Sequence, residues 1–221
     1  FKARNSVKFI IIDMYSPYVS LIQKMFPNAQ IIIDTFHLVQ LISRSLNKTR
    51  IRAMKSNKPA YNKMKRYWKL ILKDRNELDY SKRKRYTCFS NLMTEMDVVN
   101  YILDQSVELK TTYYKYQELL QSIREKNYDN FIYAINNVNN SISDHIKTSI
   151  KTLTEFKDKI CNTFNNNYHN GFIEGNNNFI KVLKRIAFGF RSFRRLKTRI
   201  MICKGLVKIN KKKTNAFALA S

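Results

Sequence analysis

Two short apolar runs near the beginning of the chain predict a pair of β-strands. The runs VKFIIID (residues 7–13) and QIIID (residues 30–34) are rich in β-branched residues and lack strict polar alternation. This pattern is typical of strands buried on both faces of a parallel or mixed sheet. Each run ends in an acid, so the sequence predicts Asp13 and Asp34 at the carboxyl ends of two strands.

The segment between these runs predicts a helix. Ser16 as N-cap and Pro17 as the first helical residue make a favourable start, and Pro27 ends the apolar periodicity. The strand–helix–strand unit should have a right-handed crossover, which puts both strand ends at one edge of the sheet. Because two strands are not a stable core alone, either further strands precede this pair or the strand assignment is wrong.

The rest of the chain has helical periodicity. One helix is expected from Thr35 to about Lys55, and residues 59–165 have the pattern of an all-α segment inserted after the second strand. The Asn-rich run NTFNNNYHNG (residues 162–171) interrupts this pattern. A final helical segment is expected from there to about Leu206, followed by the basic tail KINKKKTN.

Composition narrows the class of partner. The chain has 221 residues, 44% of them hydrophobic, which is enough to bury a substantial core. Its 41 Lys and Arg against 16 Asp and Glu give a net charge of +25, and nucleic acid is the commonest partner of such a surplus. No apolar run could span a membrane and no signal peptide opens the chain, so we expect a soluble, cytoplasmic, nucleoid-associated protein. The three cysteines form no C-x-x-C pair, which supports neither a disulfide framework nor a zinc ribbon.

Three acids stand out by their positions. Asp13 and Asp34 are the only acids before residue 74, and Glu174 is the last acid, followed by thirteen Lys and Arg. Carboxylates gathered among basic residues suit Mg²⁺, which takes oxygen ligands. A pair of such ions can activate the attacking oxygen and stabilise the leaving oxygen during a phosphodiester displacement.

Each of these acids also has a structural explanation. Asp34 can cap the helix that begins at Thr35, because Asp is a preferred N-cap. Asp13 can be a structural acid at a strand end, although Ser16 already caps the next helix. Glu174 can be a solvated helix residue, since most charged side chains are exposed. The residues by themselves leave these alternatives open.

Three dispersed motifs resemble the signature of a transposase family. They are D-M-x-x-x-Y beginning at Asp13, D-x-F-H beginning at Asp34, and E-x-x-N-x-x-x-K-x-x-x-R-x-x-x-G beginning at Glu174. In this order they are similar to the signature blocks of the DDE transposases of bacterial insertion sequences, in the ISL3 group. The resemblance covers nearly the whole chain, with a variable helical middle.

The resemblance implies a helix-dominated α/β fold, in which a large all-α insertion interrupts a partial ribonuclease-H-like core. Residues 1–58 would be the partial core with the fourth and fifth strands, 59–165 the insertion, 166–206 the carboxyl-terminal core helices with the catalytic Glu, and 207–221 a basic tail. The family's first three strands, its first catalytic Asp and its amino-terminal DNA-binding parts have no counterpart here. We therefore expect the carboxyl-terminal part of a transposase, inactive alone.

The resemblance also implies roles for particular residues. Asp13 and Glu174 match the second and third acids of the catalytic triad and would be both catalytic residues and ligands of two Mg²⁺ ions. Asp34 and His37 match a supporting signature near the active site. The other expected roles are helix ordering by Asn177 and DNA binding by Lys181, Arg185, Arg191, Arg194 and Arg195.

In the mechanism that this resemblance implies, a Mg²⁺-activated water hydrolyses one DNA strand at the element end, and the freed 3′-hydroxyl attacks target DNA. Such proteins act as homo-oligomers on paired ends, and Asp13 and Glu174 should lie within roughly 4–8 Å of each other. The alternative is a non-catalytic, basic helical protein that holds nucleic acid through residues 50–85 and 181–213. Charge alone does not distinguish the two. A membrane-surface protein is disfavoured because no amphipathic anchor is evident.

Overall fold

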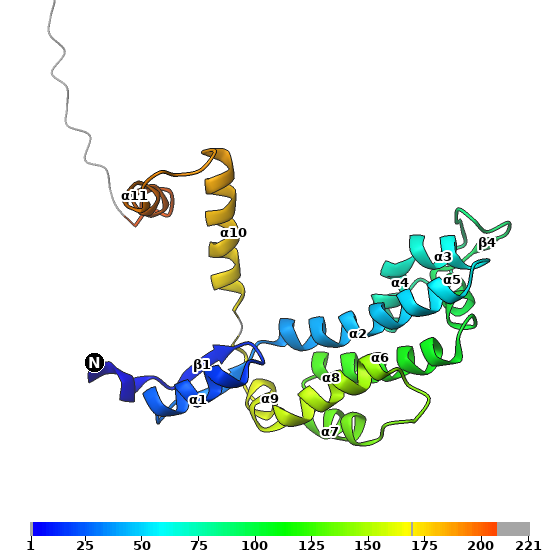
Figure 1. Ribbon diagram of the computed structural model, residues 1–221, viewed down its shortest axis with the longest axis horizontal. Helices are drawn as coiled ribbons and strands as arrows, with labels where there is room; N and C mark the ends of the chain where they lie inside the picture. The colour runs from blue at the N-terminus through cyan, green and yellow to red at the C-terminus, as the bar shows by residue number, and fades with distance from the viewer. Residues whose placement is uncertain (1, 169, 207–221) are drawn as a thin grey trace, which may run out of the picture. The chain divides into compact units, whose positions relative to one another are not determined.

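The computed structural model describes residues 2–168 and 170–206 and has a helix-dominated α/β structure (Figure 1). The chain divides into two compact units, residues 1–169 and 170–221. Two short 3-10 turns, at Lys2–Ser6 and Arg75–Glu77, accompany the helices and strands of the first unit. These helices and strands are β1 (Phe9–Ile12), α1 (Ser16–Met25), β2 (Gln30–Ile33), α2 (Thr35–Ser56), α3 (Tyr61–Arg66), α4 (Trp68–Leu72), β3 (Lys84–Arg85), β4 (Leu92–Met93), α5 (Glu95–Leu103), α6 (Val107–Arg124), α7 (Tyr128–Asn136), α8 (Asp144–Glu155) and α9 (Lys157–Phe164). The second unit contains α10 (Gly171–Ile186) and α11 (Phe193–Cys203), and the predicted basic tail lies outside the described residues.

β1 and β2 form a parallel pair, which confirms the two predicted strands. Their register pairs Ile12 with Ile33, so that both strands end at the same edge. The outer side of β2 is covered by α9. Thr163 Oγ1 accepts a hydrogen bond of 2.9 Å from the backbone N–H of Ile33, and the Asn162 amide donates to the carbonyl of Ile31 at 3.1 Å. These side chains satisfy β2 backbone groups that face away from β1.

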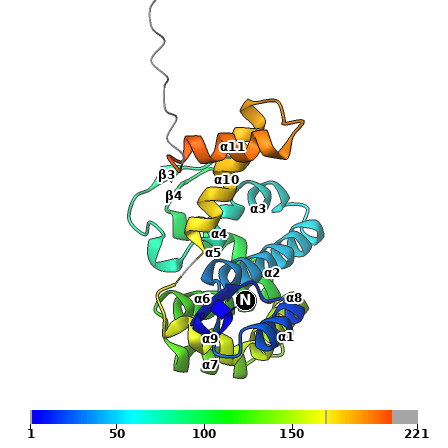
Figure 2. The same ribbon diagram turned by 90° about the vertical axis from the view of Figure 1, so that its left-hand side faces the viewer.

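α2 is the central helix of the first unit. The residues buried along its whole length include Leu38, Ile42 and Leu46, whose spacing of four places them on one face, and Met54 near its end. α6 and α8 pack against this helix, and Figure 2 shows α6 to α9 on one side of it. The 22 residues of α2 confirm the helix predicted from Thr35.

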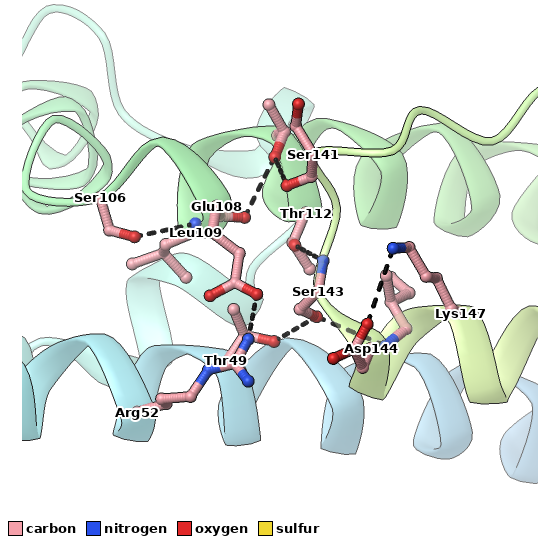
Figure 3. Close-up of polar contacts among 12 residues, drawn as sticks. Thr49, Arg52, Ser106, Glu108, Leu109, Thr112, Ser141, Ser143, Asp144 and Lys147 are labelled. Carbon is pink, nitrogen blue, oxygen red and sulfur yellow. Dashed lines mark hydrogen bonds and ion pairs between the residues drawn. The ribbon is translucent and has the colours of Figure 1, made fainter.

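A buried polar network joins α2 to α6 and to the start of α8 (Figure 3). Thr49 Oγ1 lies 2.6 Å from Ser143 Oγ, and the backbone N–H of Ser143 donates to Thr112 Oγ1 at 3.0 Å. Ser143 is also the N-cap of α8, because its hydroxyl accepts from the N–H of Ile146. All three hydroxyl residues are fully buried. A buried polar group must find a partner, so this network fixes how the helices meet.

The structure departs from three details of the sequence prediction. Ser16 is the first residue of α1 and does not cap it; Tyr15 is the N-cap, and its carbonyl accepts from the N–H of Tyr18 to close the first turn. The segment expected to be all-α contains the short antiparallel hairpin of β3 and β4. The carboxyl-terminal helical segment is broken between residues 187 and 192.

The break in the second unit follows from the backbone at Gly189. Its N–H donates to the carbonyl of Lys184 at 2.9 Å, the bond that closes a helix end when the preceding residue, here Phe188 with a φ of +51°, is left-handed. Gly189 itself has a φ of +98°, which glycine adopts without strain. Leu183 is the one buried side chain of α10, and α11 has none among the described residues. None of the helices in the described ranges is long and apolar enough to cross a membrane.

We predict that Ser143→Ala lowers the free energy of unfolding by about 1–2 kcal/mol, because it removes a helix cap and a buried hydrogen-bond partner of Thr49. Chemical denaturation followed by circular dichroism measures this change. Ser141→Ala is the matched control: Ser141 is exposed and contributes its backbone carbonyl to Thr111, so a change within about 0.5 kcal/mol is expected. Equal losses in both variants would contradict the role of the network.

Lowering the pH should reduce the stability of the first unit, because the Glu95 carboxylate becomes protonated. The Glu95 carboxylate accepts hydrogen bonds from Lys73 Nζ at 2.8 Å and from the N–H of Asp79 at 3.1 Å, and the Lys73 bond is the main cause of its lowered pKa. A carboxyl group with a lowered pKa in the folded state stabilises the fold above its unfolded pKa of about 4.3, and this contribution is lost as the pH falls through the folded pKa. Urea titrations from pH 6 to pH 3 should therefore show a smaller loss of stability in Glu95→Gln than in the unaltered chain. Parallel pH curves would contradict this.

Candidate active site at the ends of two parallel strands

Asp13 directly follows β1, at the edge where β1 and β2 end together. Its side chain is 57% exposed. The position follows from the sequence, because four apolar residues form the strand and the first polar residue leaves it. Carboxyl ends of parallel strands are the usual place for ligand sites in α/β proteins, since loops and helix starts converge there. Asp13 is thus an accessible carboxylate at a favourable edge.

Asp34 directly follows β2 and begins α2. Its backbone N–H donates to the carbonyl of Ile12 at 3.1 Å, which extends the strand pairing by one step. Its carboxylate accepts a hydrogen bond of 3.3 Å from the N–H of Phe36, so Asp34 is the N-cap of α2. Only 3% of the residue is exposed. The helix-cap alternative from the sequence is therefore the arrangement observed.

His37 connects the two strand ends. It lies in the first turn of α2, where its N–H donates to the carbonyl of Asp34 at 3.0 Å. Its Nε2 lies 2.8 Å from Oδ1 of Asp13, the distance of a hydrogen bond from the imidazole to the carboxylate. Asp34 therefore sets where α2 begins, and the first turn of α2 brings the imidazole against Asp13.

The donor set at this edge suits a hard divalent cation. The exposed Asp13 carboxylate offers oxygen, the ligand atom that Mg²⁺ prefers. The imidazole nitrogen of His37 is engaged with that carboxylate, and a hydrogen-bonded partner of this kind orients a ligand and tunes its basicity. The chemistry of the residues present therefore fits a metal-binding role for Asp13 with His37 behind it.

The remaining predicted site residues lie in the second unit. Glu174 is exposed in the first turn of α10, and Asn177, Lys181 and Arg185 follow it on the same helix, also exposed. Their spacing of three or four residues arranges them in one stripe along α10. Glu174 and Asp13 belong to different units, so the distance between these two carboxylates stays a prediction.

The predicted DNA-binding arginines occupy α11 and the segment before it. Arg191 is exposed in the connection between the two helices, whereas Arg194 and Arg195 are exposed in the first turn of α11. Arg194 and Arg195 line a cavity together with Thr198 and Arg199. Sequence reasoning missed Arg199, although its place four residues after Arg195 could have indicated a shared helix face.

The structure is that of an α/β protein with a carboxylate site at the ends of its parallel strands and many exposed cations. The sequence matches the ISL3 group of DDE transposases, a family described as transposases, over residues 1–200. The chain belongs to this transposase family.

Two relatives extend the comparison. A protein named ATP-dependent protease from Lactococcus lactis subsp. lactis is 40% identical over 113 residues, which is 51% of this chain and 36% of that protein. The transposase for insertion sequence element IS1001 from Bordetella parapertussis is 26% identical over 200 residues, covering 86% of this chain and 45% of that protein. The chain therefore spans less than half the length of either relative. No solved structure matches it.

The cap at Asp34 can be tested by two substitutions. We predict that Asp34→Ala lowers the free energy of unfolding by about 1 kcal/mol, because the N–H of Phe36 loses its acceptor. Asp34→Asn should keep most of the stability, because the amide oxygen can accept the same bond. Thermal and urea unfolding measure both variants. Equal losses in both would show that the negative charge, and not the cap, is what matters.

Proposed function

We propose that this chain is part of a DDE transposase that hydrolyses a DNA strand at the end of an insertion element and transfers the freed 3′-hydroxyl to target DNA. The observation that carries the proposal is the Asp13–His37 pair at the parallel strand ends of a chain belonging to a transposase family. Because the chain covers only part of its relatives' length, the activity is proposed for the complete protein.

The proposed fold is a ribonuclease-H-like core around β1 and β2, with residues 1–58 as a partial core, 59–165 as the insertion, 166–206 as the carboxyl-terminal core helices and 207–221 as the tail. The hydrogen bonds along the outer edge of β2 support this fold. α9 satisfies the outer backbone groups of β2 through Thr163 and Asn162, so any further strand of the sheet has to add beside β1. The strand pair can then be extended in one direction only.

In this proposal Asp13 and Glu174 together hold two Mg²⁺ ions. When bound, such a pair supplies an activated attacking oxygen and stabilises the leaving oxygen of the phosphodiester. Asp13 would provide carboxylate oxygen at the strand end, and His37 would hold its carboxylate in one orientation. Asp34 contributes indirectly, because its cap sets where the first turn of α2 begins.

The proposed DNA contacts use the exposed cations of the second unit. Lys181 and Arg185 would contact phosphate from α10, and Arg191, Arg194 and Arg195 from the connection and α11, because cations at fixed spacing neutralise successive phosphates. Asn177 would order the first part of α10. The active form would be a homo-oligomer on paired element ends, in the cytoplasm at the nucleoid.

Substitution of Asp13 tests the catalytic proposal. In the complete protein, Asp13→Asn should reduce Mg²⁺-dependent cleavage of element-end DNA to background, because a neutral amide oxygen binds Mg²⁺ more weakly than a charged carboxylate does. His37→Ala should lower cleavage by about ten- to a hundredfold, as loss of a residue that orients a metal ligand does. Cleavage of labelled element-end DNA on denaturing gels measures both.

The matched control is Asp158→Asn, which changes an exposed acid of α9 and should leave cleavage unaffected. DNA affinity is measured for the same variants, because it distinguishes the catalytic proposal from the alternative of a non-catalytic nucleic-acid-binding protein. Such a protein would bind DNA in every variant and cleave it in none. Full cleavage by Asp13→Asn would refute the proposed site.

A further inference from the structure

The positive charge of the helical region of the first unit is concentrated in α2 and in residues 58–85. Residues 58–85 contain eleven Lys and Arg and only three acids, whereas residues 86–168 contain eight Lys and Arg and ten acids. The basic part comprises α3, α4, β3 and the chain between α4 and β3. α2 adds five Lys and Arg and no acid, whereas residues 86–168 are close to neutral, so the positive charge is not a property of the whole bundle.

The three acids of this stretch are engaged within the fold and form no ion pair with its cations among the described residues. Asp74 and Glu77 both form ion pairs with Arg124 of α6, at 2.7 and 2.6 Å. Asp79 accepts hydrogen bonds from the backbone N–H groups of Ser81 and Lys82. All three carboxylates are therefore used to hold the chain in place.

Three of the eleven cations are also held internally. Lys63 Nζ donates to the Tyr101 hydroxyl at 2.9 Å, Lys73 pairs with Glu95, and the Arg75 guanidinium lies 6.0 Å from the Tyr114 ring centroid. The other eight are exposed. Lys65 and Lys69 contact the rings of Tyr61 and Trp68 within their own helices, and none of the eight forms an ion pair within the part of the chain that the structure describes. We call these eight the distal basic surface: Lys58, Lys65, Arg66, Lys69, Lys82, Arg83, Lys84 and Arg85.

The distal basic surface is built on packed elements. The Tyr67 ring contacts the rings of Tyr86 and Phe89, and Phe89 contacts Tyr101, with centroids 5.1 to 5.9 Å apart. The Tyr67 hydroxyl donates to the carbonyl of Thr87. These contacts hold the β3–β4 hairpin against α4 and α5. Cations on a rigid support lose little freedom when they bind a repeating anion.

A cavity lies within this surface. It is lined by Asn62, Lys65 and Arg66 of α3 and by Cys88 of the β3–β4 connection. Two cations and an amide donor offer charge-assisted hydrogen bonds to an anion of phosphate size. The cavity is thus chemically suited to a phosphate group of a nucleic-acid backbone.

The surface is separate from the Asp13–His37 site. His37 lies in the first turn of α2 and α3 follows its last residues; Figure 1 shows β1 near one end of α2 and α3 near the other. A helix of 22 residues is about 33 Å long, close to one turn of duplex DNA. A duplex reaching from one site to the other would therefore extend over about ten base pairs.

We propose that the distal basic surface binds the phosphate backbone of duplex DNA about one helical turn away from Asp13. The inference rests on the proposed function for the identity of the polyanion. It adds a second DNA contact in the helical insertion, apart from the cations of α10 and α11. Charge complementarity supports it, because these eight exposed cations form no ion pair among residues 2–168 and 170–206, and the family of the chain consists of transposases, which act on DNA.

Salt dependence of binding tests this proposal without any cleavage step. The full 221-residue chain is titrated onto a fluorescein-labelled 20-base-pair duplex at 50 to 300 mM salt, without metal. Each phosphate contact contributes about 0.9 to the slope of log affinity against log salt. Lys65→Gln with Arg66→Gln should reduce that slope by about two, and Lys82→Gln with Arg83→Gln should do the same at the hairpin.

The matched control is Lys151→Gln with Lys157→Gln, which removes the same charge from exposed positions of α8 and α9. It should leave the slope unchanged. Unchanged slopes in both distal variants, or an equal decrease in the control, would overturn the inference while leaving the catalytic proposal standing. If the unaltered chain does not bind the duplex, the inference that DNA is the partner of this surface is wrong. If Asp13→Asn keeps full cleavage, the catalytic proposal is wrong, but the salt slopes still test the distal basic surface.

Discussion

The turn from β2 into α2 at Asp34 is the constraint on which the first unit depends. One residue ends the strand pairing through its backbone N–H and begins the helix through its carboxylate. Any shift of the start of α2 would rotate its face by about 100° per residue. The position of Asp34 therefore determines both which face of α2 is buried and whether His37 contacts Asp13.

Buried polar groups inside the helical region also restrict how its helices pack. Thr49 and Ser143 meet across two helices, and Ser143 caps the second of them. Hydrophobic side chains alone would tolerate several ways of packing these helices, because apolar contacts are not directional. Buried hydroxyl groups that need partners restrict the choice. The rigid bundle can in this way hold the strand ends and the distal basic surface at fixed positions.

The acidic side chains have different roles in different parts of this chain. Acids in the helical region act within the fold: Asp74 and Glu77 hold Arg124, and Glu95 holds Lys73. Asp13, by contrast, is exposed among few other acids, with an imidazole as its partner. An exposed carboxylate in so basic a protein attracts cations less than it would in an acidic one, so tight metal binding needs further carboxylates, and for this reason the proposed site includes Glu174.

Local patterns determined much of the fold. β-branched runs predicted both strands, and helical periodicity predicted α2 to within a residue, because these features depend on neighbours in the chain. The acids at both strand ends and the basic composition were also evident from the sequence. Tertiary structure alone decided that His37 contacts Asp13, that α9 covers β2, and which cations lack acidic partners. Each of these depends on residues far apart in sequence, such as Ile33 and Thr163, and packing, not local preference, brings them together.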